Sequence, residues 1–131
     1  MQLPILRGGI VAARVLSHDE VLSVARRFAK DANRIFPTAT VVLFGSYSQG
    51  TAEPESDVDI AILFDEIPIK DAKELLDKRL ELTLVVADNY DEDIQVAFRL
   101  FDDPSGFVDT ILETGILIAD PHNQLARILN N

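Results

Sequence analysis

Two short apolar runs, at 40–44 and 58–64, constrain the fold of this chain more than any other feature of its sequence. Both have the length and the β-branched or aromatic composition of a β-strand. The second run is apolar on both faces after Asp59, which is typical of a strand in the interior of a sheet. The segment 45–57 between the runs is polar and rich in small residues, so it predicts a loop that joins two strands.

The second predicted strand opens on two aspartates, Asp57 and Asp59. Residues two apart on a strand point to the same face, roughly 7 Å apart along it, so both carboxylates are aimed at one place. Mg²⁺ prefers oxygen ligands and usually takes one or two protein carboxylates, while phosphate oxygens and water complete its shell. We therefore interpret the pair as magnesium ligands that face the Gly45–Ser46 turn and a nucleoside triphosphate. The alternative is that both are solvated or turn-forming charges beside a polar loop.

The glycines exclude one nucleotide-binding motif. Gly45 and Gly50 flank four residues, as the glycines of a P-loop do, but a Walker A motif needs Lys and Ser/Thr where this chain has Thr51–Ala52. What remains is a turn where the main chain can approach a phosphate closely, with the Ser46 hydroxyl as an extra donor. We interpret the other polar residues of note as solvated or helix-entry groups: His18, His122, Asp102, Asp103, Glu53, Glu55, Arg26, Arg27 and Lys30.

Helical patterns flank the two strands. Ser17 and Glu20 form a capping box, apolar residues follow at helical spacing, and Pro37 ends this first helix. Asp71 is expected to cap a second helix, whose end is ambiguous because 83–86 would also suit a strand. The buried stripe expected for the second helix is Ala72, Leu75, Leu76, Leu80 and Leu84.

The C-terminal third predicts further elements. Residues 94–98 alternate as a third strand would, and Pro104 suits the first position of a helix that runs through about Thr114. Gly115 fits the left-handed C-cap of that helix. Residues 116–118 predict an edge strand or a tail packed on the core, and the last ten residues predict a weak helix. This order of elements indicates an α/β (α+β) fold, with a small mixed β-sheet flanked by helices.

The chain has 131 residues, which suits one compact domain over 1–131. We expect its core at about 17–118, between an N-terminal arm, 1–16, and a C-terminal tail, 119–131. The net charge of −10 argues against bulk binding of nucleic acid, and the absence of cysteine excludes disulfides and thiolate zinc sites. No apolar run approaches the roughly 20 residues that span a bilayer.

The N-terminal arm is apolar, but the run Arg7–Gly9 interrupts it before a signal sequence could form. We therefore expect a cytoplasmic protein without a membrane partner. The apolar surface of this arm is a candidate contact for a homo-oligomer.

The residues Gly45–Ser46, Gly50 and Asp57–Val58–Asp59, set around a strand, a loop and a second strand, resemble the signature of the DNA polymerase β-type nucleotidyltransferase superfamily. The length of the chain is similar to that of the minimal nucleotidyltransferases in that superfamily. The specific resemblance covers 45–59 and implies a polymerase β-like fold. It implies that Gly45, Ser46 and Gly50 bind the triphosphate and that Asp57 and Asp59 ligate Mg²⁺. It also implies transfer of a nucleoside monophosphate to an acceptor hydroxyl, with release of pyrophosphate.

The resemblance further implies a third carboxylate from a later strand. Asp93, Gln95 and Ala97 share one face of the third predicted strand, and only Asp93 is acidic, so it is the candidate for this catalytic and metal-binding role. If the position is instead that of Gln95 or Ala97, the chain binds nucleotide and metal but catalyses poorly. The loop also departs from the family, because Tyr47–Ser48–Gln49 lacks the Lys or Arg often found there.

The resemblance implies a partner as well. Minimal nucleotidyltransferases are often paired with a small helical protein of the HEPN type, and some pairs behave as toxin and antitoxin. The acceptor is then a partner protein or a small molecule. The alternative function is a catalytically weak or inactive antitoxin module that acts by binding alone. A third reading is an unrelated acidic α/β protein in which the motif is coincidental.

Overall fold

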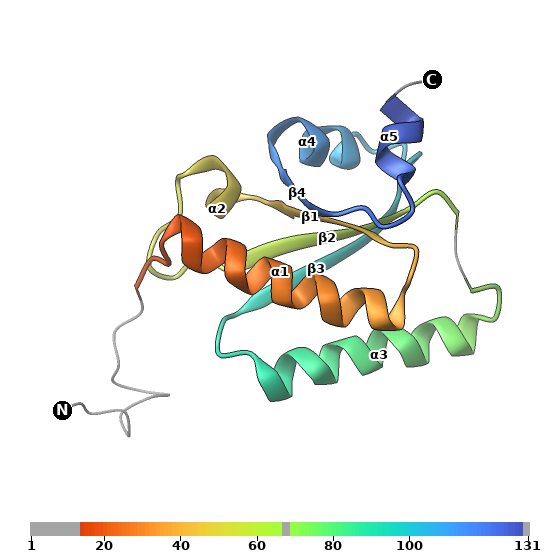
Figure 1. Cartoon of the computed structure of the whole chain (residues 1–131), viewed down its shortest axis with the longest axis horizontal. Coiled ribbons are helices and arrows are strands. Elements are labelled where there is room, and N and C mark those ends of the chain that lie inside the picture. The colour runs from red at the N-terminus through yellow and green to blue at the C-terminus, as the bar shows by residue number, and fades with distance from the viewer. Residues whose placement is uncertain (1–13, 67–68, 130–131) are drawn as a thin grey trace.

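The computed structural model describes residues 14–66 and 69–129 of the chain. The predictions about the apolar N-terminal arm concern 1–16 and fall almost entirely outside the described residues. In chain order the elements are α1 (His18–Ile35), β1 (Thr40–Phe44), α2 (Ser46–Gln49), β2 (Val58–Phe64), α3 (Ala72–Asn89), β3 (Ile94–Leu100), α4 (Phe107–Thr114), β4 (Ile116–Ala119) and α5 (Gln124–Leu129) (Figure 1).

The four strands form one mixed sheet in the order β3-β2-β1-β4. The loop after β1 returns the chain antiparallel, so β1 and β2 pair from Thr40↔Leu63 to Phe44↔Asp59. Helix α3 then crosses over, and β3 pairs parallel with β2 from Val58↔Ile94 to Phe64↔Leu100. Strand β4 pairs antiparallel with the other side of β1. The predicted mixed sheet, with 58–64 in its interior and 116–118 at an edge, is confirmed.

The two faces of the sheet pack against different helices because side chains alternate along each strand. Helices α1 and α3 cover the face that carries Val41, Leu43, Ile60 and Ile62, where the larger part of the core lies. Helix α4 covers the opposite face, where Val108 and Ile111 pack against three strand residues: Val42, Ala61 and Leu63. Asp59 alternates with Ile60 and so lies on the α4 face.

Helix α1 begins as predicted. The Ser17 hydroxyl accepts a hydrogen bond from the Glu20 amide, and the Glu20 carboxylate accepts one from the Ser17 amide, at 3.1 Å and 2.8 Å. At the other end of the chain, Gln124 is buried and its side chain bonds the carbonyl of Thr38 and the amide of Asp65, so α5 is fastened to the sheet. Among the described residues no helix is long and apolar enough to cross a membrane.

The predicted stripe of α3 is wrong. Leu76, Leu80 and Leu84 are 65%, 54% and 53% exposed, Ala72 is exposed, and Leu75 is only half-buried. The helix instead turns a second apolar face inward, of which Leu82 is the fully buried member. The alternative of a strand at 83–86 is also wrong, because α3 continues to Asn89. A helix with two apolar stripes gives no sign in its sequence of which one meets the sheet.

The predicted start of α4 and its C-cap also differ. Pro104 and Ser105 lie in a turn, in which the Asp103 carboxylate accepts from the Ser105 amide, and the helix begins only after Gly106 at φ +86°. Gly115 is extended rather than left-handed, with φ −85°. Glycine is needed at this position because there is no room for a side chain: a Cβ would lie 2.6 Å from a methyl group of Val42.

Candidate functional site

The end of β1 and the start of β2 lie side by side, so the turn after one meets the carboxylates of the other. Phe44 is in register with Asp59, and Gly45 follows directly. A Cβ on Gly45 would lie 2.4 Å from Asp59 Oδ2, and the backbone of Gly45 has φ +77°. Only glycine fits this position, because any side chain would be strained and would displace the Asp59 carboxylate. The two parts of the sequence motif are therefore in direct contact.

The segment after Gly45 forms one helical turn, α2, where a loop was predicted. The amides of Ser48 and Gln49 donate to the Gly45 carbonyl at 3.2 Å, and the Ser48 hydroxyl donates to it at 2.9 Å. Gly50 ends the turn in the left-handed conformation. Tyr47 is buried, and its hydroxyl accepts the Leu16 amide at 3.1 Å, which ties the turn to the residues before α1.

Asp57 is positioned by the turn that precedes it. The Ser56 hydroxyl accepts from the Glu53 amide at 2.8 Å, and the Ser56 amide donates to the Glu53 carbonyl at 2.9 Å. Burial raises the pKa of Asp59 above its ordinary value, and the neighbouring charge of Asp57 raises this pKa further. The second effect means that the two carboxylates lie close enough to repel each other.

The predicted third carboxylate, Asp93, is not the register neighbour of Asp59. The register of β2 and β3 sets Gln95 beside Asp59, whereas Asp93 lies just before β3 and is exposed. The main chain does bring Asp93 close to the start of β2, because its carbonyl accepts the Val58 amide at 2.8 Å. Within the described part of the chain, no group of three or more His, Cys, Asp or Glu side chains lies where it could hold a metal ion.

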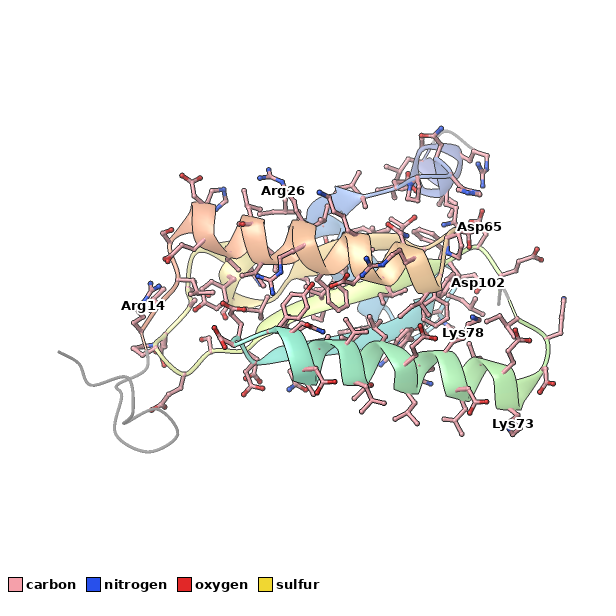
Figure 2. All side chains as sticks on the ribbon, turned by 60° about the horizontal axis from the view of Figure 1, so that its bottom comes forward. Arg14, Arg26, Asp65, Lys73, Lys78 and Asp102 are labelled. Atoms are coloured by element: carbon pink, nitrogen blue, oxygen red, sulfur yellow. The ribbon has the colours of Figure 1, made fainter. Side chains whose placement is uncertain are left out.

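Sequence reasoning missed one charged residue near the turn. Arg14 donates two hydrogen bonds to the Glu20 carboxylate, at 2.9 Å and 2.7 Å, and Figure 2 shows it at the opposite end of the molecule from Asp65. The Glu20 carboxylate raises the pKa of Arg14, and Tyr47 of α2 contributes to the same shift. No local pattern in the sequence could have connected Arg14 with Tyr47, because only the fold brings them together.

The donor set fits a divalent cation. Asp57 and Asp59 supply hard oxygen ligands on one face of one strand, and their mutual repulsion is the kind of charge that a bound cation would neutralise. Two carboxylates do not fill the coordination shell of Mg²⁺. Phosphate oxygens and water normally supply its remaining ligands. His18 and His122 are both exposed, far apart in sequence, and belong to no such group.

Comparison with protein families gives a match over most of the chain. The family model described as polymerase beta, nucleotidyltransferase matches residues 28–124. This range contains the Gly45–Ser46 turn, Asp57 and Asp59 at the start of β2, and all four strands of the described residues.

Two archaeal relatives align with part of the chain. A protein of Methanocaldococcus jannaschii, provisionally classed as a protein adenylyltransferase, is 38% identical over 61 residues, which cover 45% of this chain and 62% of that protein. The protein adenylyltransferase MntA of Thermococcus cleftensis is 37% identical over 54 residues, which cover 41% of this chain and 54% of that protein. The matched segment thus spans between about half and three fifths of those relatives.

Solved structures share the fold. A toxin–antitoxin structure with AMP-PNP is 25% identical and covers 79% of this chain and 78% of that chain, with a TM-score of 0.55. A provisionally classed nucleotidyltransferase of Sulfolobus solfataricus is 18% identical and covers 76% of this chain and 80% of that chain, with a TM-score of 0.52. A mutant of the toxin–antitoxin MntA–HpeT is 22% identical over 87% of this chain and 80% of that chain, with a TM-score of 0.53.

Proposed function

Because the chain belongs to the polymerase β nucleotidyltransferase family, we propose that it transfers a nucleoside monophosphate from a nucleoside triphosphate to an acceptor hydroxyl. The contact between Gly45 and the Asp59 carboxylate carries this proposal. The strand pair β1–β2 holds the glycine turn against the two carboxylates. The turn lets the main chain approach a phosphate closely, and the carboxylates beside it can bind a cation.

Asp57 and Asp59 hold Mg²⁺ in this proposal. Bound magnesium neutralises charge on the phosphoryl group under attack and lowers the pKa of the acceptor hydroxyl. Asp59 is half-buried on a central strand, so its position is set before the substrate arrives. Gly45, Ser46 and Gly50 bind the triphosphate, the glycines by allowing close approach of the main chain and Ser46 through its hydroxyl.

Asp93 is the third carboxylate of the proposed site and acts on the acceptor side. The hydrogen bond between the Val58 amide and the Asp93 carbonyl supports this role, because it keeps the start of β3 beside the start of β2.

The acceptor we propose is a hydroxyl on a partner protein. The relatives named as protein adenylyltransferases and the toxin–antitoxin structures support this choice. AMP-PNP in one of those structures supports ATP as the nucleotide. The partner is expected to be a small helical protein of the HEPN type.

The test is a transfer assay with labelled nucleoside triphosphates and Mg²⁺, with the chain alone and with the helical protein encoded beside it. We expect label on the partner, pyrophosphate release, and loss of both with Asp57→Asn or Asp59→Asn. Partner binding that survives both substitutions, with no transfer by the unaltered chain, would refute an enzymatic role.

A second candidate function has an observation of its own. Gln95, rather than an acid, is the register neighbour of Asp59, and the described residues hold no three-carboxylate group. These features favour an antitoxin or regulatory module that binds nucleotide, metal and partner without turnover. The same assay distinguishes the two functions, because the module would neutralise its partner equally well with Asp59→Asn.

A further inference from the structure

The outer edge of β3 is open. Strand β3 is the last strand on its side of the sheet, and no strand of the described residues pairs with its free edge. Its pairing with β2 runs without interruption along seven residues, with no bulge and no proline. A long, regular edge strand of this kind presents main-chain donors and acceptors that another strand can bind.

The hydrogen bonds to β2 identify the residues that face the free edge. Asp93 accepts from Val58 and Phe101 donates to Phe64, so the odd-numbered residues of β3 point their main-chain groups toward β2. The even-numbered residues therefore point theirs outward. The carbonyl of Phe98 agrees with this alternation, because the exposed side chain of Arg99 donates to it at 2.9 Å.

Beside this edge, α3 and β3 enclose an apolar groove of about 420 Å³. Leu76 and Leu80 of α3 line it while remaining 65% and 54% exposed, and Val96 and Phe98 of β3 form its floor. No carboxylate lines the groove, although the chain carries a net charge of −10, and Arg79 is the one charged residue among the described residues that line it. The Arg79 guanidinium lies 4.5 Å from the centroid of the Phe98 ring. Figure 2 shows α3 as an outer helix of the molecule, so this flank is open to a neighbour.

We propose that β3 pairs antiparallel with β3 of a second copy of this chain, and that the α3 flank of each copy fills the groove of the other. The arrangement is a two-fold interface in which one surface meets itself. Among the described residues the groove holds no carboxylate, and its one charged lining residue, Arg79, lies with its guanidinium over the Phe98 ring. Self-contact there therefore avoids the carboxylates that cover so acidic a chain and brings together only the Arg79 of each copy.

The charges of β3 select the register of this pairing. Residues whose main-chain groups point to the free edge must lie opposite each other in the two copies. A pairing in which Val96 of one copy lies opposite Val96 of the other satisfies this requirement. It sets Asp93 of one copy directly opposite Arg99 of the other, and the symmetry makes this contact twice. Opposite charges directly across an antiparallel pair stabilise it, and like charges destabilise it. In the single chain the Arg99 guanidinium also lies 3.6 Å from the Asp103 carboxylate and over the Phe107 ring. On binding, the Ile94 amide of the second copy takes the Phe98 carbonyl from Arg99, and the guanidinium exchanges the Asp103 carboxylate for Asp93 of the second copy.

The first test is the mass of the chain in solution, measured by light scattering and by sedimentation velocity. We expect a species of twice the 14.5 kDa chain mass, whereas a monomer across the accessible concentration range overturns the proposal. Arg99→Glu should raise the dimer dissociation constant about tenfold or more, because it sets two carboxylates against each other at both contacts. The double variant Asp93→Arg with Arg99→Glu should restore the dimer. Failure of this restoration, with both variants folded by circular dichroism, rejects the register and with it the proposal.

A matched pair on α3 tests the groove. Leu80 and Leu84 are 54% and 53% exposed, but only Leu80 is among the groove-lining residues. Leu80→Glu should dissociate the dimer and Leu84→Glu should not, and equal behaviour of the two variants contradicts the proposed interface. These readouts measure mass rather than nucleotidyl transfer, so the dimer can fail separately from the proposed activity, although Asp93 takes part in both proposals. The Leu80→Glu and Leu84→Glu pair avoids the residues of the proposed site.

Discussion

The two halves of the candidate site are built on different parts of the sheet. One half joins β1, α2 and β2, where the Asp59 carboxylate touches Gly45 and every other residue of the two strands except Phe44 is buried. The other half is the start of β3, an edge strand, where Asp93 is exposed and lies before the first paired residue. The first half is held by the core of the protein, whereas the Asp93 side chain at the start of the second half is exposed, just outside the paired part of β3. We therefore expect substitutions in the first half to have the larger effects.

The largest effect is expected from Asp57 and Asp59, just before and within β2. Asp57→Asn or Asp59→Asn should reduce nucleotidyl transfer by about a thousandfold or more, because each removes a ligand of an ion that contributes several kcal/mol to transition-state stabilisation. Initial rates of pyrophosphate release measure this loss. Glu55→Gln, which neutralises an exposed carboxylate in the same loop, is the matched control and should retain the rate. Equal losses in the control would show that loop charge, rather than metal ligation, is what matters.

The start of β3 should give a smaller effect. If Asp93 acts on the acceptor, Asp93→Asn should lower the rate constant of transfer by about a hundredfold, the lower range for a lost general base. Gln95→Ala should leave the rate nearly unchanged. The reverse result would assign the third position to the register neighbour of Asp59. Two unaffected variants, in a chain that still transfers nucleotide, would mean that two carboxylates suffice.

The same difference explains what could be predicted from the sequence. The strands 40–44 and 58–64 were predictable because short apolar segments of this kind are buried in most folds. That Asp57 and Asp59 point to the same side was predictable because side chains two apart on a strand share one face. The contact of Gly45 with Asp59 was implied by the spacing of the motif but needed the antiparallel register to become a distance.

The parts that failed depend on tertiary contacts. The inward face of α3 could not be chosen from its sequence, because Leu76, Leu80 and Leu84 form as good a stripe as the buried one does. The conformation of Gly115 was mispredicted because that glycine serves packing against Val42 rather than a helix end. The role of Asp93 stays a prediction. Its position relative to Asp59 depends on the β2–β3 register, which is set by a crossover through α3 that no local pattern encodes.

An intermediate effect is expected at the contact that joins the turn to β2. Gly45→Ala places a Cβ 2.4 Å from Asp59 Oδ2 at a φ of +77°, so it should cost about 1–3 kcal/mol in stability and weaken Mg²⁺ binding about tenfold. Calorimetric titration with Mg²⁺ measures the affinity. Gly106→Ala is the control, because Gly106 also has a positive φ but a Cβ there meets nothing within 4 Å. It should lower stability by about 1 kcal/mol with unchanged Mg²⁺ affinity.

The smallest expected effect is a gain in stability from Asp59→Asn, the same substitution that we expect to reduce activity most. A carboxyl whose pKa is higher in the folded than in the unfolded protein binds its proton more tightly when folded. The stability it contributes is therefore complete below its ordinary pKa of about 3.9 and is lost as the pH rises through the raised value. Burial and Asp57 both raise the pKa of Asp59. Without divalent cations, Asp59→Asn should thus raise Tm by a few degrees at neutral pH, and the difference should vanish in acid.

Magnesium should reverse the order of the two proteins. The ion stabilises only the form that binds it, so Mg²⁺ should raise the Tm of the unaltered chain and leave Asp59→Asn where it was. Thermal unfolding over a range of pH, with and without Mg²⁺, measures both effects, and Glu55→Gln should follow the unaltered chain throughout. An Asp59→Asn variant that is less stable than the unaltered chain at neutral pH without cations would contradict this account. The carboxylate pair would then be satisfied within the protein, and the strongest physical reason for a cation at this end of β2 would be gone.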